Sequence, residues 1–320
     1  MNWEPTEMMV AIGDLAKQIY TGSPEAPWPH LVEAGLLDVE AVLDEAALLV
    51  RHGRAGAPGP LLETLCLGWP ARQAGLVDRS AVGTAGLHEP GARDPRAART
   101  VVVDGRATGT KVAVPAAERA SYIVIPATDG VYLVRPTDCT IEQGVGTHDE
   151  SVSIVTMDGV PAQRIGGLEL LEPWLQRIEV GLCALLLGLA QEALFMTARY
   201  VGDRKQFGKP IGSFQAVGQR AADAWIQIQA MELTLWSAAW RVSEGLDADR
   251  ALRIARWQAS EGSHFVLAAA QHLHAGMGYD RDYPLHRYFL VAKHWEHTLG
   301  GPGHQLQSLG DWMASQVSGA

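Results

Sequence analysis

The spacing of hydrophobic residues predicts short helices in the first part of the chain. Met8, Ile12 and Leu15 recur at helical intervals, and residues 43–50 repeat the pattern before a loop rich in Gly and Pro. No catalytic cluster is recognisable in this part. We therefore expect a reduced helical domain over residues 1–78.

From about residue 80 the period of the pattern changes. Short β-branched runs alternate with Asp-Gly and Pro turns, and no helical pattern lies between them. The runs are 101–103, 112–114, 122–125, 131–134 and 152–155. Strands that follow one another without helices favour an antiparallel sheet or small barrel over βαβ units. We expect this β domain over residues 79–166.

Beyond residue 167 helical spacing returns with longer stripes. Apolar stripes cover about 182–196, 221–242 and 252–273, and a fourth helical stretch covers 285–295. Short loops between long amphipathic helices are typical of an antiparallel four-helix bundle. The predicted fold class is therefore α+β: an N-terminal helical segment, a small antiparallel β domain and a C-terminal four-helix bundle over residues 167–320.

Composition narrows the classes of function. Hydrophobic residues make up 47% of the chain and charged residues 19%, as in ordinary globular proteins. The net charge of −10 argues against a nucleic acid as the main partner. No Gly-x-Gly-x-x-Gly follows a strand and no P-loop motif is present, so neither nucleotide-binding fingerprint can be claimed.

The pattern predicts neither membrane insertion nor a secretory signal. The longest apolar run, 180–190, is about half as long as a bilayer-spanning helix. The N-terminus has acidic residues and no basic segment before an apolar one. Cys66, Cys139 and Cys183 are odd in number and widely spaced, which is typical of reduced thiols. We expect a cytoplasmic protein.

Two stretches carry candidate chemistry. In the first, Arg204 to Pro210 with Gln215, several cations and amides could bind an anionic ligand, because Arg offers a planar fork of donors. In the second, around Gly276, glycines let the backbone approach a phosphate. A solvated basic loop and a Gly-terminated helix remain the alternatives.

The histidines do not predict a metal site. Seven of the 11 lie at or beyond His264, and His272 with His274 could be drawn as a ligand pair. A zinc site needs three or four convergent ligands, and no Cys lies nearby.

Several motifs together resemble those of the acyl-CoA dehydrogenase family. They are 188–194, 204–211 with 214–217, and 274–279 with 281–284. Residues 89–92 and the segment around Trp28 match the same family in the same order. The resemblance covers nearly the whole chain and is strongest between residues 179 and 284.

The resemblance implies FAD as the cofactor, bound between the β domain of one subunit and the bundle of its neighbour. The positions that reach across the dimer to the pyrophosphate and adenine correspond here to Arg204, Gln206, Phe207 and Gln215. Gly276 matches the glycine whose backbone meets the pyrophosphate, and His272 replaces a Gln usual at that edge.

The β domain departs from the family pattern. Its Trp-x-Thr strand, which packs on the isoalloxazine in the family, is replaced by Val112–Pro115, and Pro115 has no N–H to donate. His88 stands where the family has Thr. These departures suggest that the chain completes an FAD site held mainly by a partner, like the shorter subunit of heteromeric α2β2 actinobacterial sterol or steroid acyl-CoA dehydrogenases.

The family's catalytic base is displaced as well. Leu299 stands where most of the family has Glu, and leucine cannot accept a proton. A minority of the family carries the base on the first bundle helix, a position that corresponds here to Glu179. The alternative is a solvated Glu near a helix terminus. Glu296 is the fallback if a three-residue gap is allowed.

The implied reaction is the dehydrogenation of an acyl-CoA thioester to the trans-2-enoyl-CoA, with an electron-transfer flavoprotein as acceptor. The resemblance to the heteromeric enzymes favours a bulky sterol- or steroid-derived CoA ester. Two alternatives remain: a non-catalytic structural subunit of the same complex, and a self-sufficient homotetramer that uses Glu179.

Overall fold

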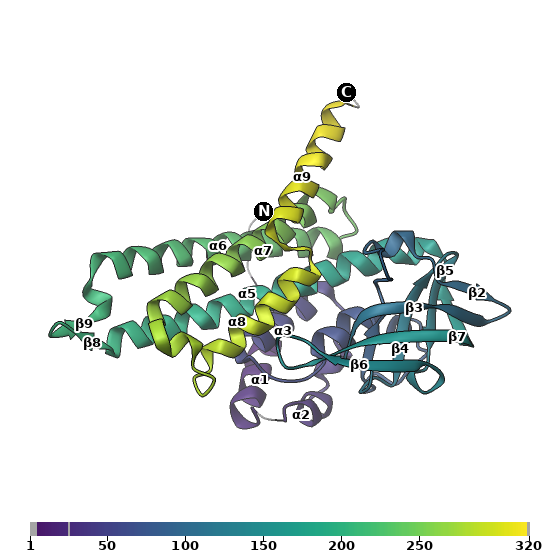
Figure 1. The fold of residues 1–320 in the computed structure, drawn as a ribbon, viewed down its shortest axis with the longest axis horizontal. Coiled ribbons are helices and arrows are strands. Elements are labelled where there is room, and N and C mark those ends of the chain that lie inside the picture. Colours follow the sequence, from purple (N-terminus) through teal and green to yellow (C-terminus); the bar gives the residue numbers. More distant parts are fainter. Residues whose placement is uncertain (1–4, 25, 319–320) are drawn as a thin grey trace. The chain divides into compact units, whose positions relative to one another are not determined.

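The structure is a computed structural model that describes residues 5–24 and 26–318 (Figure 1). It divides into two compact units. Unit 1 contains the residues up to Leu31, Val39–Pro58 and those from Glu179 onward. Unit 2 contains Val32–Asp38 and Gly59–Ile178. Unit 1 is therefore assembled from segments that lie far apart in the sequence.

The first helices of the chain are α1 (Glu7–Gly22), α2 (Trp28–Glu33) and α3 (Val42–Ala55). Thr6 caps α1 by accepting a hydrogen bond from the Met9 N–H. In unit 1 the buried side chains of Tyr20 and His52 join α1 to α3 through a 2.9 Å hydrogen bond. The short helices predicted from the hydrophobic spacing are thus present.

The C-terminal part of unit 1 is a helical bundle. Its helices are α5 (Leu171–Asp203), whose first turns belong to unit 2, α6 (Gln215–Ser243), α7 (Asp249–His274), α8 (Leu285–Thr298) and α9 (Gly301–Ser318). Helices α3 and α5 cross closely at Gly53 and Gly188, where a Cβ on either residue would overlap a backbone carbonyl of the other helix. The predicted helical bundle is confirmed, and α9 follows it as a helix that the pattern did not predict.

Unit 2 contains a seven-stranded sheet with the order β1-β4-β5-β7-β3-β2, and β6 also pairs with β7. The strands are β1 (Gly83–Ala85), β2 (Val101–Val103), β3 (Arg106–Pro115), β4 (Tyr122–Ala127), β5 (Gly130–Val134), β6 (Thr140–Val145) and β7 (Ser151–Gly166). Short helical turns precede the sheet, including α4 (Trp69–Gln73). The core is formed by β-branched and aromatic side chains such as Val114, Ile123, Ile125 and Tyr132.

The sheet agrees with the predicted antiparallel β layer, with three differences. Strand β1 pairs in parallel with β4, whereas the other pairs are antiparallel. Strand β6 has mostly exposed polar residues, so it lacked the apolar run that marked the other strands. Strand β7 extends well past the predicted 152–155. The predicted strand was too short because the Asp158-Gly159 pair resembles a turn, although it lies inside the strand.

One described helical stretch, Leu168–Asp203, is long and apolar enough to cross a membrane, with a mean hydropathy of 1.7 in its most apolar window. Within the structure 78% of that window is buried. The stretch is therefore a core helix of the fold.

Candidate functional site

A two-residue hairpin follows α5 and presents three of the predicted cofactor-binding residues. Strands β8 (Lys205–Gln206) and β9 (Lys209–Pro210) pair across Phe207 and Gly208, whose φ angles are +53° and +77°. Positive φ at both central residues is the geometry of a type I′ turn, which suits Gly but is rare for Phe. The turn leaves the Phe207 side chain 92% exposed.

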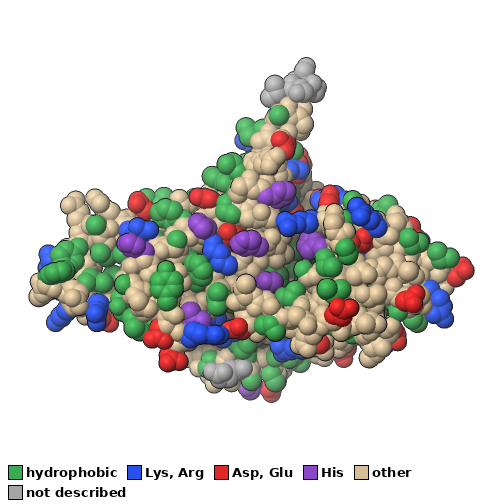
Figure 2. All heavy atoms as spheres, in the orientation of Figure 1, with side chains coloured by type: hydrophobic (Ala, Val, Ile, Leu, Met, Phe, Trp, Pro, Cys, Tyr) green, Lys and Arg blue, Asp and Glu red, His purple; other side chains and the backbone are tan. Residues whose placement is uncertain are grey.

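The hairpin is tied at its base to α5. The Arg204 N–H donates to the Tyr200 carbonyl, and the Arg204 carbonyl accepts from the Ile211 N–H, both at 2.8 Å. Its backbone is thus fixed, while the side chains of Arg204 and Gln206 remain exposed. Figure 2 shows Lys and Arg side chains at this end of the bundle. These exposed donors are available to a ligand, but the hairpin segment alone does not enclose one.

Gln215, the fourth of these residues, begins α6 beside the hairpin and is also exposed. The rings of Phe207 and Phe214 meet edge to face with centroids 6.1 Å apart. The Lys209 ammonium lies 4.4 Å from the centroid of the Phe214 ring. The structure therefore brings the hairpin and the start of α6 together.

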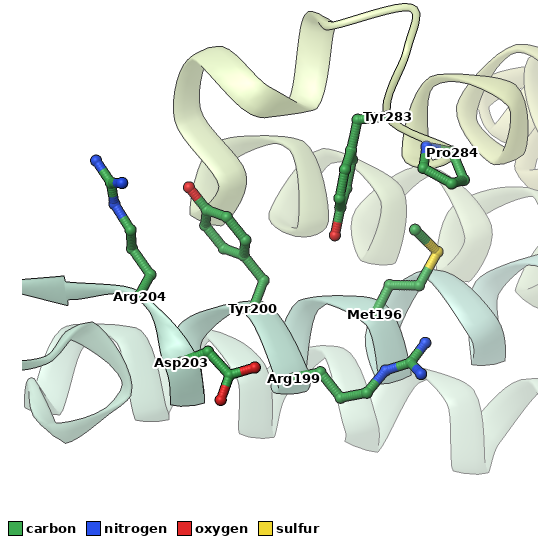
Figure 3. A pocket seen from close by; sticks show the side chains of 7 residues that line it. All are labelled: Met196, Arg199, Tyr200, Asp203, Arg204, Tyr283 and Pro284. Atoms are coloured by element: carbon green, nitrogen blue, oxygen red, sulfur yellow. The ribbon is translucent and has the colours of Figure 1, made fainter.

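An open pocket of about 520 Å³ lies beside Arg204 (Figure 3). One wall is a single face of α5 and the other comes from the segment before α8. The lining residues are Met196, Arg199, Tyr200, Asp203, Arg204, Tyr283 and Pro284. Rings, guanidinium groups and a carboxylate thus share one depression within the size range of ligand sites.

Buried His274 connects the end of α7 to this pocket. Its ring stacks on Tyr200 with centroids 4.4 Å apart. Its Nδ1 donates to the Ala270 carbonyl at 2.8 Å, so its Nε2 is left to accept from the Tyr283 hydroxyl at 3.1 Å. Burial lowers the pKa of His274, partly opposed by the Ala270 hydrogen bond. Both ring nitrogens are therefore engaged in the packing of this end.

His272 and Gly276 lie on either side of His274. His272 is exposed near the end of α7, and Gly276 lies in the 3₁₀ turn Ala275–Tyr279. No atom lies within 4 Å of the position that a Cβ on Gly276 would take, so its backbone can be approached from outside. Because His274 packs on Tyr200, these residues and Arg204 belong to the same end of the bundle. Among the described residues, no group of three or more His, Cys, Asp or Glu could hold a metal ion.

Glu179 lies on α5 and forms an ion pair with Arg256 of α7. Arg256 Nη1 donates to Glu179 Oε1, and the Arg256 and Glu179 side chains are 16% and 17% exposed, respectively. Arg256 also donates through Nε and Nη2 to Gln305 Oε1 of α9, at 2.9 and 2.8 Å. The Gln305 side-chain amide in turn donates to the Leu299 carbonyl. One chain of contacts thus links Glu179 to the turn where Leu299 lies.

The Glu179–Arg256 pair is largely withdrawn from solvent. Burial and, to a smaller extent, the Glu179 charge raise the pKa of the nearby Cys183 thiol to about 12, partly opposed by the Arg256 charge. The pair therefore lies beside the bundle core and not on its open surface.

Comparison with known proteins identifies relatives over nearly the whole chain. The sequence profile of the acyl-CoA dehydrogenase C-terminal domain matches residues 167–312. The chain is 34% identical to the acyl-CoA dehydrogenase FadE28 of Mycobacterium tuberculosis, over 97% of this chain and 98% of that protein. The chain belongs to the acyl-CoA dehydrogenase family.

Solved acyl-CoA dehydrogenase structures show the same fold over nearly all of the chain. A structure described as the Tcur3481-Tcur3483 steroid ACAD has a TM-score of 0.90 and 33% identity, and covers 98% of this chain and 99% of that chain. The ChsE4-ChsE5 complex from Mycobacterium tuberculosis has a TM-score of 0.90 and 30% identity, with the same coverage. Members of this family are FAD-binding oxidoreductases that act on the CH–CH bond of acyl-CoA.

The donor set at the hairpin end fits part of an FAD molecule. Arg204 supplies a guanidinium, Gln206 and Gln215 supply amides, and Gly276 supplies approachable backbone. A guanidinium and open backbone suit a pyrophosphate, and amides suit an adenine edge. These residues would hold the dinucleotide end of the cofactor.

The β3 stretch Val112–Pro115, which replaces the family's Trp-x-Thr strand, is paired within its own sheet. The Val112 N–H donates to the His88 carbonyl at 2.9 Å. Val114 is the register partner of Ser153 in β7. The Thr84 hydroxyl donates to the carbonyl of Pro115, which has no N–H. Val114 and Pro115 are buried and Pro115 has no N–H to donate, so this stretch lacks the aromatic ring and a backbone donor of the family's Trp-x-Thr strand.

The motif at Glu89 has a structural role in this acyl-CoA dehydrogenase. Its carboxylate accepts from Lys111 Nζ at 2.6 Å and from the Thr100 hydroxyl at 2.7 Å, and the Lys111 side chain is fully buried. Burial alone would raise the pKa of Glu89, but the hydrogen bonds from Lys111, Thr100 and Arg99 hold it at about 2. The pair anchors the start of the β region.

Glu296, the fallback base, is 3% exposed on α8. Its carboxylate lies 2.7 Å from Lys293 Nζ and 3.8 Å from the His264 ring. It therefore belongs to a separate ion-paired cluster.

Sequence reasoning missed three residues of the site. His274 was named only as part of the 274–279 motif and as half of a metal pair, without a role of its own in the site. Arg256 and Gln305 carried no signal, because Arg256 contacts Glu179 across 77 residues of sequence and α9 was not predicted.

Proposed function

We propose that this chain is one subunit of a hetero-oligomeric, FAD-dependent acyl-CoA dehydrogenase. Its bundle completes an FAD site whose ring-binding half belongs to a homologous subunit, in an α2β2 arrangement. One contrast carries the proposal: exposed donors suited to a pyrophosphate gather at the hairpin end, while the β3 stretch has neither the aromatic ring of the family's Trp-x-Thr strand nor an N–H at Pro115. A chain with only half of a cofactor site needs the other half from a partner.

The names of the two similar structures support a two-protein assembly. Each names a pair of proteins, and one is called a complex. The name of the first includes the word steroid. We propose by this similarity that the substrate is a bulky CoA ester of a sterol side chain or a steroid ring remnant. An electron-transfer flavoprotein is the proposed acceptor, and the reduced thiols of Cys66 and Cys183, which form no disulfide in the described structure, suit the cytoplasm.

In the proposed reaction Glu179 accepts the α-proton of the thioester. The β-hydrogen leaves with its electron pair, and the α,β double bond forms. Bound FAD supplies the acceptor for that hydride. The position of Glu179 supports this role, because Arg256 and Gln305 connect it to the Leu299 turn, where most of the family carries its base.

The experiment uses the chain co-purified with its homologous partner. A CoA thioester of a steroid carboxylic acid and butyryl-CoA are mixed anaerobically with the complex, and loss of flavin absorbance is followed. We expect fast reduction by the steroid thioester in the complex. Reduction by neither thioester, with FAD bound, would contradict the dehydrogenase assignment of this complex.

Glu179→Gln tests the proton acceptor within the same assay. Loss of general base catalysis should lower the rate about 10²- to 10⁴-fold. Glu192→Gln is the matched control, because Glu192 is another α5 glutamate paired with an arginine, Arg199, at 3.4 Å. It should leave the rate unchanged.

A second candidate function is a non-catalytic structural subunit. The ion pair between Glu179 and Arg256 favours it, since a carboxylate held by a guanidinium can serve packing alone. Full activity of the Glu179→Gln complex would establish this alternative. A third candidate, a homotetramer that uses Glu179, requires that the chain bind FAD alone.

A further inference from the structure

Arg256 has a geometry that does more than neutralise Glu179. Its guanidinium donates in two directions: Nη1 to Glu179 on α5, and Nε with Nη2 to Gln305 on α9. The donors of a guanidinium form a rigid planar fork, so fixing one edge on Gln305 fixes the direction of the other edge. The place of the Glu179 carboxylate is thereby coupled to α9.

Gln305 is itself held in one orientation. It is 2% exposed, its oxygen must face the donors of Arg256, and its nitrogen donates to the Leu299 carbonyl. Leu299 is followed by Gly300 and Gly301, whose φ angles of +97° and +78° form the turn into α9. The turn thus sets where Gln305 lies.

We propose that Arg256 is a positioning residue for Glu179 and that Gln305 holds Arg256 in place, so that the turn before α9 aims the proton acceptor. This inference rests on the proposed function of Glu179. The expected contribution is twofold: Gln305 and Arg256 keep the carboxylate in register with the substrate's α-carbon, and the charge of Arg256 favours the ionised form that can accept a proton.

Helix α9 has a second tie to α7 that serves as a matched control. Arg253 Nη1 donates to the Ser308 hydroxyl at 2.9 Å, and Arg253 Nε donates to Asp249 at 2.8 Å. This tie joins the same two helices through the same type of donor. These two hydrogen bonds go to Asp249 and Ser308, so the tie separates anchoring of α9 from aiming of the base.

The test uses the FAD-loaded complex with the steroid thioester, and measures the rate of anaerobic flavin reduction between pH 5 and 9. Arg256→Met should lower the rate about 10²-fold, since a misplacement of about 1 Å at a reacting group costs that much. The acid limb of its pH–rate profile should move to higher pH, because the cation that favours the ionised carboxylate is lost.

Arg256→Lys should restore the acid limb but not the full rate, because it keeps the charge and loses the fork. Gln305→Leu should lower the rate about tenfold with little movement of the limb. Ser308→Ala should keep the native rate and limb. Thermal unfolding of each variant checks that the chain remains folded.

Three results would overturn the inference. A native rate and a native acid limb in both Gln305→Leu and Arg256→Lys would show that Gln305 and Arg256 do not position Glu179. An equal loss of rate in Ser308→Ala and Gln305→Leu would show the same. Arg256→Met lowering the rate of a Glu179→Gln complex as strongly as that of the native complex would show that Arg256 acts elsewhere. Full turnover of the Glu179→Gln complex would instead contradict the proposed function itself, in which Glu179 accepts the α-proton.

Discussion

The hairpin end of unit 1 and the β3 region of unit 2 use their polar groups in opposite ways. At the hairpin, Arg204 and Gln206 are exposed on a backbone that is fixed by hydrogen bonds. In unit 2, Lys111 is fully buried and pairs with Glu89. The first arrangement leaves donors for a ligand, and the second uses them to hold the fold. Within this one chain, therefore, one region leaves its polar side chains exposed and the other uses them to hold the fold.

Lys111→Met should have the largest effect, and it should act on stability. It leaves the buried Glu89 carboxylate without its counter-ion, which costs about 3–5 kcal/mol. We expect thermal denaturation of the purified chain to show a drop in Tm of about 10 °C.

The double variant Lys111→Met with Glu89→Gln is the control for Lys111→Met. It removes both charges and should recover part of the loss. An unchanged Tm in the single variant would show that the pair does not hold unit 2 together.

Glu63 gives a pH-dependent test of buried polar groups in unit 2. Burial, with a smaller contribution from Glu150, raises the pKa of Glu63 to about 8, against an ordinary value of 4.5. For an acid with a raised pKa in the folded state, stability falls as pH rises from about 4.5 to about 8, because only the unfolded chain ionises freely in that window. Glu63→Gln should therefore raise Tm by about 5 °C at pH 8 and by little at pH 4.5. A gain of equal size at both pH values would point to another cause.

Arg204→Met should show the opposite behaviour to Lys111→Met. Its exposed guanidinium supports no fold contact that we describe, so Tm of the chain should not change. The FAD affinity of the complex should fall about 10- to 100-fold, as expected for lost hydrogen bonds to a charged group. Arg220→Met is the control, because Arg220 is also exposed but lies on α6. It should leave flavin titrations unchanged.

Phe207→Ala should have the smallest effect. The side chain is 92% exposed and meets only the edge of Phe214 among the ring contacts described, so Tm should change by less than about 1 °C. If Phe207 reaches an FAD held by the partner, flavin titration should show an affinity loss of a few-fold. Equal affinity of the native and variant complexes would place Phe207 outside the cofactor site.

Local patterns carried most of what the sequence could predict. The long helices were predicted from the helical period of their apolar residues. The hairpin residues could be recognised together because they lie within a dozen positions of one another. Strand β6 and helix α9 were missed because polar residues dominate the first and a Gly-Pro-Gly start obscures the second. The contacts of Arg256 with Glu179 and Gln305 could not be predicted from the sequence, because these residues come together only when α5, α7 and α9 pack.

The central claim is that this chain holds only part of an FAD site, and flavin stoichiometry tests it most directly. The chain is purified alone and with its homologous partner, and bound FAD is measured per protein by absorbance after gel filtration. The account predicts no retained FAD in the chain alone and stoichiometric FAD in the complex. Stoichiometric FAD in the chain alone would contradict it.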